Sequence, residues 1–287
     1  MKTSFIEYNG AGQPLHFLHA NGYPFFCYKP LLDLMQTKHH VFGMLLRPLW
    51  EGSNPKEIND WHIFSDDLLR FLPDYDANGA TPVIGVGHSI GATVTLRAAL
   101  RDPRKFRALV LIEPVLFPPR RLILWNIVRA IGLGYKLHPL IRTALKRRRT
   151  FDDLEQVFRR YRSRKVFRYM SDENLRLYID GITKPSADGG FELEFSPEWE
   201  ARIYYTGLRD FDIWRALPRL EAPTLFLRGA ETDTFWEEAA ALVKQKQPRA
   251  RVETFDKSTH LLPLERPKEV FEIMQSFLKN VPQVSVI

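Results

Sequence analysis

Residues 81–96 constrain the fold of this chain more than any other segment. An apolar run at 83–86 predicts a buried strand, and the pattern over 92–100 predicts a helix. Between them lies the sequence Gly-His-Ser-Ile-Gly at 87–91, which places Ser89 at the tip of a sharp strand-to-helix turn. Such a turn strains the backbone at the serine and needs small residues two positions to either side. The alternative is a glycine-rich turn with an incidental serine.

Strand and helix patterns alternate along most of the chain. Apolar runs without polar alternation predict buried strands at residues 14–18, 39–46, 106–112, 223–227 and 251–255. Strands of this kind, separated by helices, favour an α/β fold with a mostly parallel sheet covered on both faces.

The alternation stops between Glu113 and about Tyr205, where helix-like runs and a looser stretch at 183–196 follow one another. We therefore predict a core formed by residues 1–117 and 206–287, with a helical cap formed by residues 118–205. An insertion at this point lies over the carboxyl ends of the strands, where open α/β sheets bind ligands.

Two further residues are candidates for chemistry with Ser89. Asp233 follows one predicted strand and His260 follows the next, so all three are expected at the same edge of a parallel sheet. Ser89 would be the nucleophile, His260 its general base, and Asp233 the carboxylate that orients the imidazole. Glu113 also follows a strand and is the alternative acid; Glu231 is a weaker one.

A serine nucleophile also needs backbone donors for the developing oxyanion. The N–H of Ile90, the residue after the serine, is one candidate. The second is the N–H of Asn21 in the early His-Ala-Asn-Gly loop, with Ala20 as the alternative. We expect His88 to be a packed neighbour and His19 a structural hydrogen-bonding residue.

Four segments together resemble the α/β-hydrolase superfamily of the type with a helical cap: HANG, GHSIG, RGAETD and STHLLPLERP. The resemblance covers essentially the whole chain. It implies a serine hydrolase but does not specify a substrate. We predict cleavage of a carboxylic ester through an acyl-enzyme, without cofactor or metal. Dehalogenases and epoxide hydrolases of this fold carry an aspartate nucleophile. The serine at position 89 therefore disfavours those two activities here. Ala20 replaces the family's usual glycine, and Arg47-Pro48-Leu49-Trp50 replaces its usual Asp and Gly-rich turn.

Three other functions are compatible with the same residues. The triad also serves C–C bond hydrolysis and acyl transfer, and only the pocket separates these reactions from ester cleavage. A ligand-binding protein that retained the fold is the third alternative. Within the cap, Trp125 and Trp199 are candidate substrate-binding residues.

The charge of the chain is concentrated in the predicted cap. Residues 118–170 hold fifteen Lys or Arg and three acidic residues, whereas the whole chain carries a net charge of +7. A basic and apolar mixture suits an anionic membrane surface, an anionic substrate or a solvated helix face; nucleic acid is disfavoured because no binding module accompanies the charge.

With one cysteine, Cys27, no visible signal peptide and no membrane-spanning run, we expect a cytoplasmic protein, with peripheral membrane contact as a further possibility. The oligomeric state is not predicted.

Overall fold

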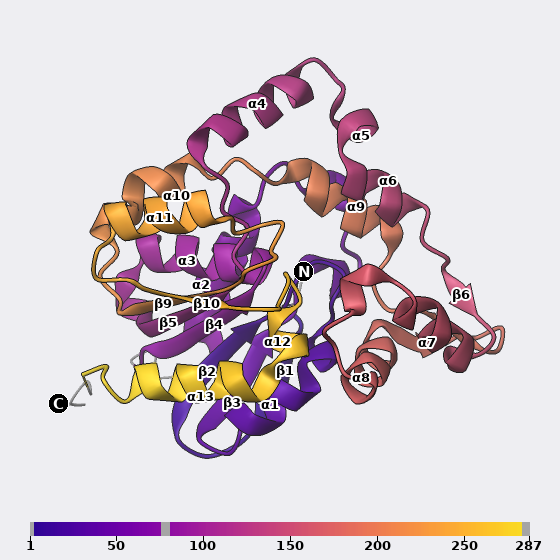
Figure 1. The fold of residues 1–287 in the computed structure, drawn as a ribbon, viewed down its shortest axis with the longest axis horizontal. Helices are drawn as coiled ribbons and strands as arrows, with labels where there is room; N and C mark the ends of the chain where they lie inside the picture. Colours follow the sequence, from indigo (N-terminus) through magenta and orange to yellow (C-terminus); the bar gives the residue numbers. More distant parts are fainter. Residues whose placement is uncertain (1–2, 76–80, 283–287) are drawn as a thin grey trace.

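The computed structural model describes residues 3–75 and 81–282, which form a twisted sheet with helices on both faces (Figure 1). Seven strands lie in the order β1-β3-β2-β4-β5-β9-β10, and only β1 runs antiparallel to its neighbour. Their bounds are β1 Phe5–Asn9, β2 Gln13–Leu18, β3 His39–Met44, β4 Val83–His88, β5 Phe106–Ile112, β9 Thr224–Gly229 and β10 Arg251–Phe255. The predicted α/β fold with a mostly parallel sheet is confirmed.

Helices cover both faces of the sheet and account for the apolar composition of its strands. One face packs against α2 (His62–Tyr75), α3 (Ile90–Arg101), α10 (Phe211–Ala216) and α11 (Glu237–Lys246). The other packs against α1 (Lys29–Met35), α12 (Leu262–Glu265) and α13 (Pro267–Leu278). Every residue of β4 and β9 is buried, as expected for central strands of a parallel sheet.

The chain leaves the sheet after β5 and returns to it at β9. The intervening helices are α4 (Pro119–Ala130), α5 (Gly134–Leu137), α6 (Pro139–Leu145), α7 (Leu154–Arg162), α8 (Asp172–Ile182) and α9 (Pro197–Thr206). Figure 1 shows α4 to α8 extending beyond the carboxyl edge of the sheet as a separate layer. We refer to these inserted elements as the cap; its exact limits stay a prediction.

The cap also contains a small antiparallel sheet that the sequence pattern did not indicate. Its strands are β6 (Thr150–Phe151), β7 (Thr183–Pro185) and β8 (Phe191–Leu193), in the order β6-β8-β7. Residues 183–196, predicted as a looser stretch, therefore form a short hairpin. Gly189 and Gly190 turn it, with φ of 90° and 69°, a conformation that glycine adopts without steric cost.

None of the described helices combines the length and the hydropathy that a bilayer-spanning segment needs.

Candidate active site

Ser89 lies in the turn from β4 to α3, in a conformation that the glycines around it make possible. Its φ and ψ are 57° and −123°, which is strained for a residue with a side chain. A Cβ at Gly87 would lie 2.5 Å from the backbone of Gly91, and one at Gly91 would lie 2.1 Å from the carbonyl oxygen of Leu18. The tight packing of these segments requires both glycines. The predicted strand–turn–helix unit is present.

The structure brings His260 against Ser89 and Glu113 against His260. The His260 Nε2 lies 3.0 Å from Ser89 Oγ, and its Nδ1 lies 3.2 Å from Glu113 Oε2. Glu113 follows β5, the strand that pairs with both β4 and β9, so its carboxylate lies between the Ser89 turn and the loops that follow β9 and β10. The imidazole therefore connects a hydroxyl to a carboxylate, in the relative positions that a hydrolytic triad needs.

Glu113 is held in place by several donors. Its side chain is fully buried and accepts hydrogen bonds from the backbone N–H of Gly229, at 2.5 Å, and from the hydroxyls of Thr232 and Thr234. The Thr234 hydroxyl also lies 2.8 Å from His260 Nδ1, so the imidazole N–H is shared between this hydroxyl and the carboxylate. Because the carboxylate is buried among donors, its charge is compensated inside the protein.

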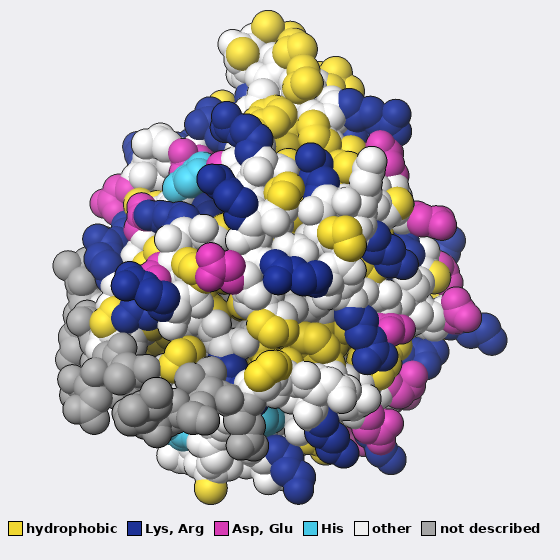
Figure 2. All heavy atoms as spheres, turned by 90° about the vertical axis from the view of Figure 1, so that its left-hand side faces the viewer, with side chains coloured by type: hydrophobic (Ala, Val, Ile, Leu, Met, Phe, Trp, Pro, Cys, Tyr) yellow, Lys and Arg dark blue, Asp and Glu magenta, His cyan; other side chains and the backbone are white. Residues whose placement is uncertain are grey.

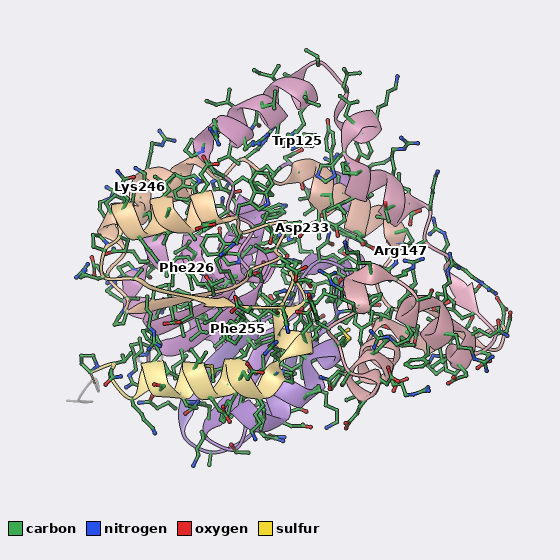
Figure 3. The ribbon with its side chains drawn as sticks, viewed as in Figure 1. Trp125, Arg147, Phe226, Asp233, Lys246 and Phe255 are labelled. Atoms are coloured by element: carbon green, nitrogen blue, oxygen red, sulfur yellow. The ribbon has the colours of Figure 1, made fainter. Side chains whose placement is uncertain are left out.

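The expected contact between Asp233 and His260 is not formed, and Glu113 takes that place. Thr232 and Thr234 both direct their hydroxyls to Glu113, whereas the Asp233 side chain between them makes no such contact. Asp233 is exposed, and within the described structure it makes no hydrogen bond or ion pair with His260. Figure 3 labels it on the loop between β9 and α11. The weaker alternative, Glu231, pairs instead with Arg168 and Tyr169 of the cap.

The electrostatics of His260 follow from these neighbours. Burial lowers the pKa of the imidazole, but the hydrogen bond and the charge of Glu113, together with smaller contributions from the charges of Asp233 and Glu265, more than offset this. The pKa of His260 is therefore raised above its ordinary value of 6.5. A more basic imidazole accepts the Ser89 proton more readily.

A second network connects the loop that follows β2 to the loop that holds His260. The N–H of Ala20 donates to the Tyr28 hydroxyl at 3.1 Å, and that hydroxyl lies 2.8 Å from His88 Nδ1. The His88 Nε2 lies 2.8 Å from the carbonyl oxygen of His260, so Nε2 carries the proton and Nδ1 accepts from Tyr28. Burial lowers the pKa of His88 well below its usual range, which keeps the ring neutral. His88 is thus a buried, packed residue beside Ser89, as predicted.

The loop after β2 is fixed by hydrogen bonds on both sides. His19 Nε2 accepts from the N–H of Leu46 at 3.0 Å, and His19 Nδ1 donates to the Ala20 carbonyl at 2.9 Å, which confirms its structural role. The Asn21 side chain donates to the carbonyl oxygen of Glu200 on α9 at 3.1 Å. Ala20 uses its N–H on Tyr28, whereas the N–H groups of Asn21 and Ile90 have no acceptor among the described residues.

The two candidate tryptophans occupy different surroundings. Trp199 is buried in the apolar core between α9 and the sheet. Trp125, labelled below α4 in Figure 3, packs edge-on against His138 with ring centroids 4.8 Å apart. In the described ranges, no group of three or more His, Cys, Asp or Glu side chains is arranged to hold a metal ion.

Sequence reasoning did not identify Tyr28, Thr234 or the pair formed by Arg147 and Glu200. The Arg147 guanidinium lies 2.6 Å from the Glu200 carboxylate, and both side chains are largely buried beside Gly22. No local motif marks these residues, because their partners lie far away in the sequence.

Comparisons with known proteins agree with this geometry. Residues 17–273 match the model of the Alpha/beta hydrolase family, so the chain belongs to the α/β-hydrolase family. The crystal structure of E-2-(acetamidomethylene)succinate hydrolase is similar, with a TM-score of 0.74 at 18% identity over 97% of this chain and 99% of that one. At this identity the likeness shows the fold.

Two curated relatives also match part or most of the chain. A type I acyl-CoA thioesterase of Penicillium brevicompactum is 28% identical over 116 residues, which are 35% of this chain and 26% of that protein. The match thus spans about a quarter of the thioesterase. Ethanol acetyltransferase 1 of Hanseniaspora uvarum is 22% identical over 93% of this chain and 80% of its own length.

Proposed function

We propose that the protein hydrolyses a carboxylic ester or thioester through an acyl-enzyme on Ser89. The observation that carries the proposal is the contact of His260 with the Ser89 hydroxyl at one ring nitrogen and with the buried Glu113 carboxylate at the other. A serine hydroxyl is a poor nucleophile near neutral pH, and this arrangement supplies the base that it needs.

The reaction would proceed in two steps. Ser89 Oγ attacks the carbonyl carbon while its proton passes to His260 Nε2, and the oxyanion accepts hydrogen bonds from the N–H groups of Asn21 and Ile90. The tetrahedral intermediate collapses, and the leaving alcohol or thiol takes the proton from His260. Water then attacks the acyl-enzyme, His260 accepts its proton, and the acid leaves as Ser89 regains a hydrogen. The Glu113 carboxylate accepts the hydrogen bond of His260 Nδ1–H and stabilises the imidazolium.

Two of the relatives have names that indicate related acyl chemistry. One relative is named as an acyl-CoA thioesterase and another as an acetyltransferase. Transfer to an alcohol differs from hydrolysis only in the second nucleophile, and C–C bond cleavage on the same triad is the remaining alternative. We favour hydrolysis over acyl transfer because hydrolysis needs only water as the second substrate.

Replacement of the serine tests the proposal directly. Ser89→Ala should abolish labelling by a fluorophosphonate probe and turnover of ester and thioester panels, because no other group at this position can form the acyl-enzyme. Thr93→Ser on α3 is the control, since it keeps a hydroxyl one helical turn away and should be labelled like the wild type. Full labelling of a folded Ser89→Ala protein would refute the assignment.

We also propose that the enzyme acts at an anionic membrane surface. Eight of the large hydrophobic side chains exposed on the protein lie within residues 123–145, on α4, α5 and α6. We call them the apolar cap face: Ile123, Leu124, Ile127, Ile131, Tyr135, Leu137, Leu140 and Leu145. Figure 2 shows hydrophobic side chains gathered at the top of the molecule, where α4 and α5 lie, with Lys and Arg directly beneath.

The positive charge next to the apolar cap face supports an anionic lipid as its binding partner. Residues 118–150 contain nine Lys or Arg and no acidic residue. An apolar surface bordered by cations is the composition of elements that lie in the membrane interface, where the apolar side chains enter the headgroup region and the cations meet anionic lipids. Exposed apolar patches of this kind mark interaction sites.

A further inference from the structure

Beneath the cap lies a partly open cavity of about 550 Å³ that is separate from the reacting side chains. It lies among α6, α7 and α8, and its lining includes Tyr23 and Glu200 but, of the described residues, neither Ser89 nor His260. Its size is that of a small-molecule site.

Positive charge dominates the wall of this cavity. Five cationic side chains line it: Lys146, Arg147, Arg148, Arg160 and Arg164. Three acidic side chains do so as well: Asp152, Asp153 and Glu200. Glu200 is neutralised by Arg147 and Asp152 by Arg148. Arg160 and Arg164 have no carboxylate partner in the described ranges, and Arg164 lies over the Tyr161 ring, 5.2 Å from its centroid. We call this space the basic cavity.

Aromatic rings lead from the basic cavity to the loop beside Ser89. Tyr161 stacks on Phe167 with centroids 5.3 Å apart, Phe167 lies 5.5 Å from Tyr178, and Tyr178 lies 5.2 Å from Tyr23. The Tyr23 ring in turn lies 6.3 Å from that of His88, the residue that precedes the nucleophile. The wall of the cavity is therefore continuous with the active-site loops.

The inner end of the basic cavity also touches the loop that carries Asn21. The Arg147 and Glu200 side chains lie so close to Gly22 that a Cβ there would be 3.4 Å and 3.2 Å from them, respectively. The Glu200 carbonyl holds the Asn21 side chain. Figure 3 labels Arg147 just beyond α6, on the cap side of the molecule. A ligand in the cavity would thus lie next to one proposed oxyanion donor.

We propose that the basic cavity binds an anionic group of the substrate, a phosphate or a carboxylate, while the scissile carbonyl lies at Ser89. This rests on the function proposed above. Arg147 is committed to Glu200 and Arg148 to Asp152, which leaves Lys146, Arg160 and Arg164 without a carboxylate partner among the described residues. Of these three, Arg160 and Arg164 carry guanidinium groups. A guanidinium pairs with either anion in a bidentate manner. The aromatic wall accommodates the apolar chain between the anion and the carbonyl.

The test compares substrates that differ only in the anion. Butyryl-4′-phosphopantetheine is paired with butyryl-pantetheine, which lacks the phosphate, and 4-nitrophenyl hemisuccinate is paired with 4-nitrophenyl butyrate. The variant is Arg160→Gln/Arg164→Gln. Its matched control is Arg159→Gln/Lys165→Gln, which removes the same charge from exposed positions that do not line the cavity.

We expect Arg160→Gln/Arg164→Gln to raise KM for the anionic member of one pair about tenfold with kcat unchanged, because contacts made equally in the ground and transition states are lost. The neutral member and the control variant should behave like the wild type. A response to butyryl-4′-phosphopantetheine identifies a phosphate, and a response to the hemisuccinate identifies a carboxylate. No change for either anionic substrate would overturn the proposal.

Binding and labelling separate this proposal from the catalytic one. Coenzyme A and succinate are titrated into the wild type and both variants by calorimetry, which reads the cavity without turnover. Binding that weakens only in Arg160→Gln/Arg164→Gln supports the cavity even if no ester is cleaved, whereas absence of binding by both probes overturns it. Fluorophosphonate labelling of the same samples reports on Ser89 independently.

Discussion

Tyr28 joins the two loops that hold the reacting groups, through one hydroxyl. It accepts from the Ala20 N–H and donates to His88, whose other nitrogen donates to the carbonyl oxygen of His260. Within this network the Ala20 N–H is already hydrogen-bonded, and the backbone of His260 is held in place. It also explains why Ala20, the alternative oxyanion donor considered from the sequence, is not available for that role.

Tyr28→Phe should weaken both stability and catalysis. It leaves the Ala20 N–H and His88 Nδ1 unpaired in a buried site, which should lower the free energy of unfolding by about 1–3 kcal/mol. The looser His260 loop should lower kcat. Denaturant unfolding and ester turnover measure the two effects. Tyr169→Phe, whose hydroxyl serves an exposed carboxylate, is the control; a Tyr28→Phe protein as stable and active as this control would contradict the role of the network.

The sequence predicted individual contacts correctly where a motif determines the backbone conformation. It failed where the direction of a side chain determines which residue makes the contact. The Gly-x-Ser-x-Gly turn and the late histidine were sufficient to predict the Ser89–His260 contact. The choice between Asp233 and Glu113 depended on which residues of the loop after β9 point inward. Both carboxylates follow strands, so their positions in the sequence are equivalent; the inward direction of Thr232 and Thr234 is a property of the folded loop.

At the scale of elements, the helices α4 to α6 form the apolar cap face. Only Leu122 of α4 is buried, whereas Ile123, Leu124 and Ile127 each expose more than half of the side-chain surface. A helix that presents apolar residues to solvent gains free energy when another surface covers it. The sequence predicted the apolar and basic mixture; that these apolar residues are exposed required the structure.

The membrane proposal predicts a dependence on lipid charge. The protein should float with phosphatidylglycerol vesicles, bind phosphatidylcholine vesicles much less, and lose the difference at high salt. Leu124→Ser/Ile127→Ser should weaken vesicle binding by about tenfold or more, because each buried aliphatic side chain contributes about 1.5–3 kcal/mol.

Phe26→Ser, which changes an exposed ring outside the cap, is the control and should bind vesicles like the wild type. Equal binding to both lipids would refute the proposal. So would a dimer in light scattering that dissociates in Leu124→Ser/Ile127→Ser, because that result would assign the face to a second copy of the chain.

For the whole molecule, the sequence predicted the core better than the cap. Buried parallel strands are nearly continuous apolar runs, and the family shares the same order of strands and helices. The sheet, and the edge at which Ser89 and His260 meet, could therefore be predicted from the sequence pattern. The cap lacks such regularity. Its short strands, its basic cavity and the Arg147–Glu200 pair are formed by contacts between distant segments, which hydropathy patterns do not encode.

The assembled molecule also determines how activity depends on pH. His260 accepts a proton only when neutral, so reactivity rises as pH passes its pKa, and that pKa is raised above 6.5 chiefly because Glu113 offsets the effect of burial. Glu113→Gln removes the charge that raises the pKa of His260, whereas burial, which lowers that pKa, remains. The increase in reactivity should therefore occur at lower pH. Asp233→Asn should move it in the same direction but less, since Asp233 acts only through its charge at a distance.

The most direct test of the account is the rate of fluorophosphonate labelling against pH for the wild type, Glu113→Gln and Asp233→Asn, because it needs no knowledge of the substrate. We predict that Glu113→Gln lowers the plateau rate by about 10³-fold or more, while Asp233→Asn stays within a few-fold of the wild type. If Asp233→Asn reduces labelling as severely as Glu113→Gln, or if Glu113→Gln is labelled like the wild type, the Ser89–His260–Glu113 arrangement is not the catalytic one.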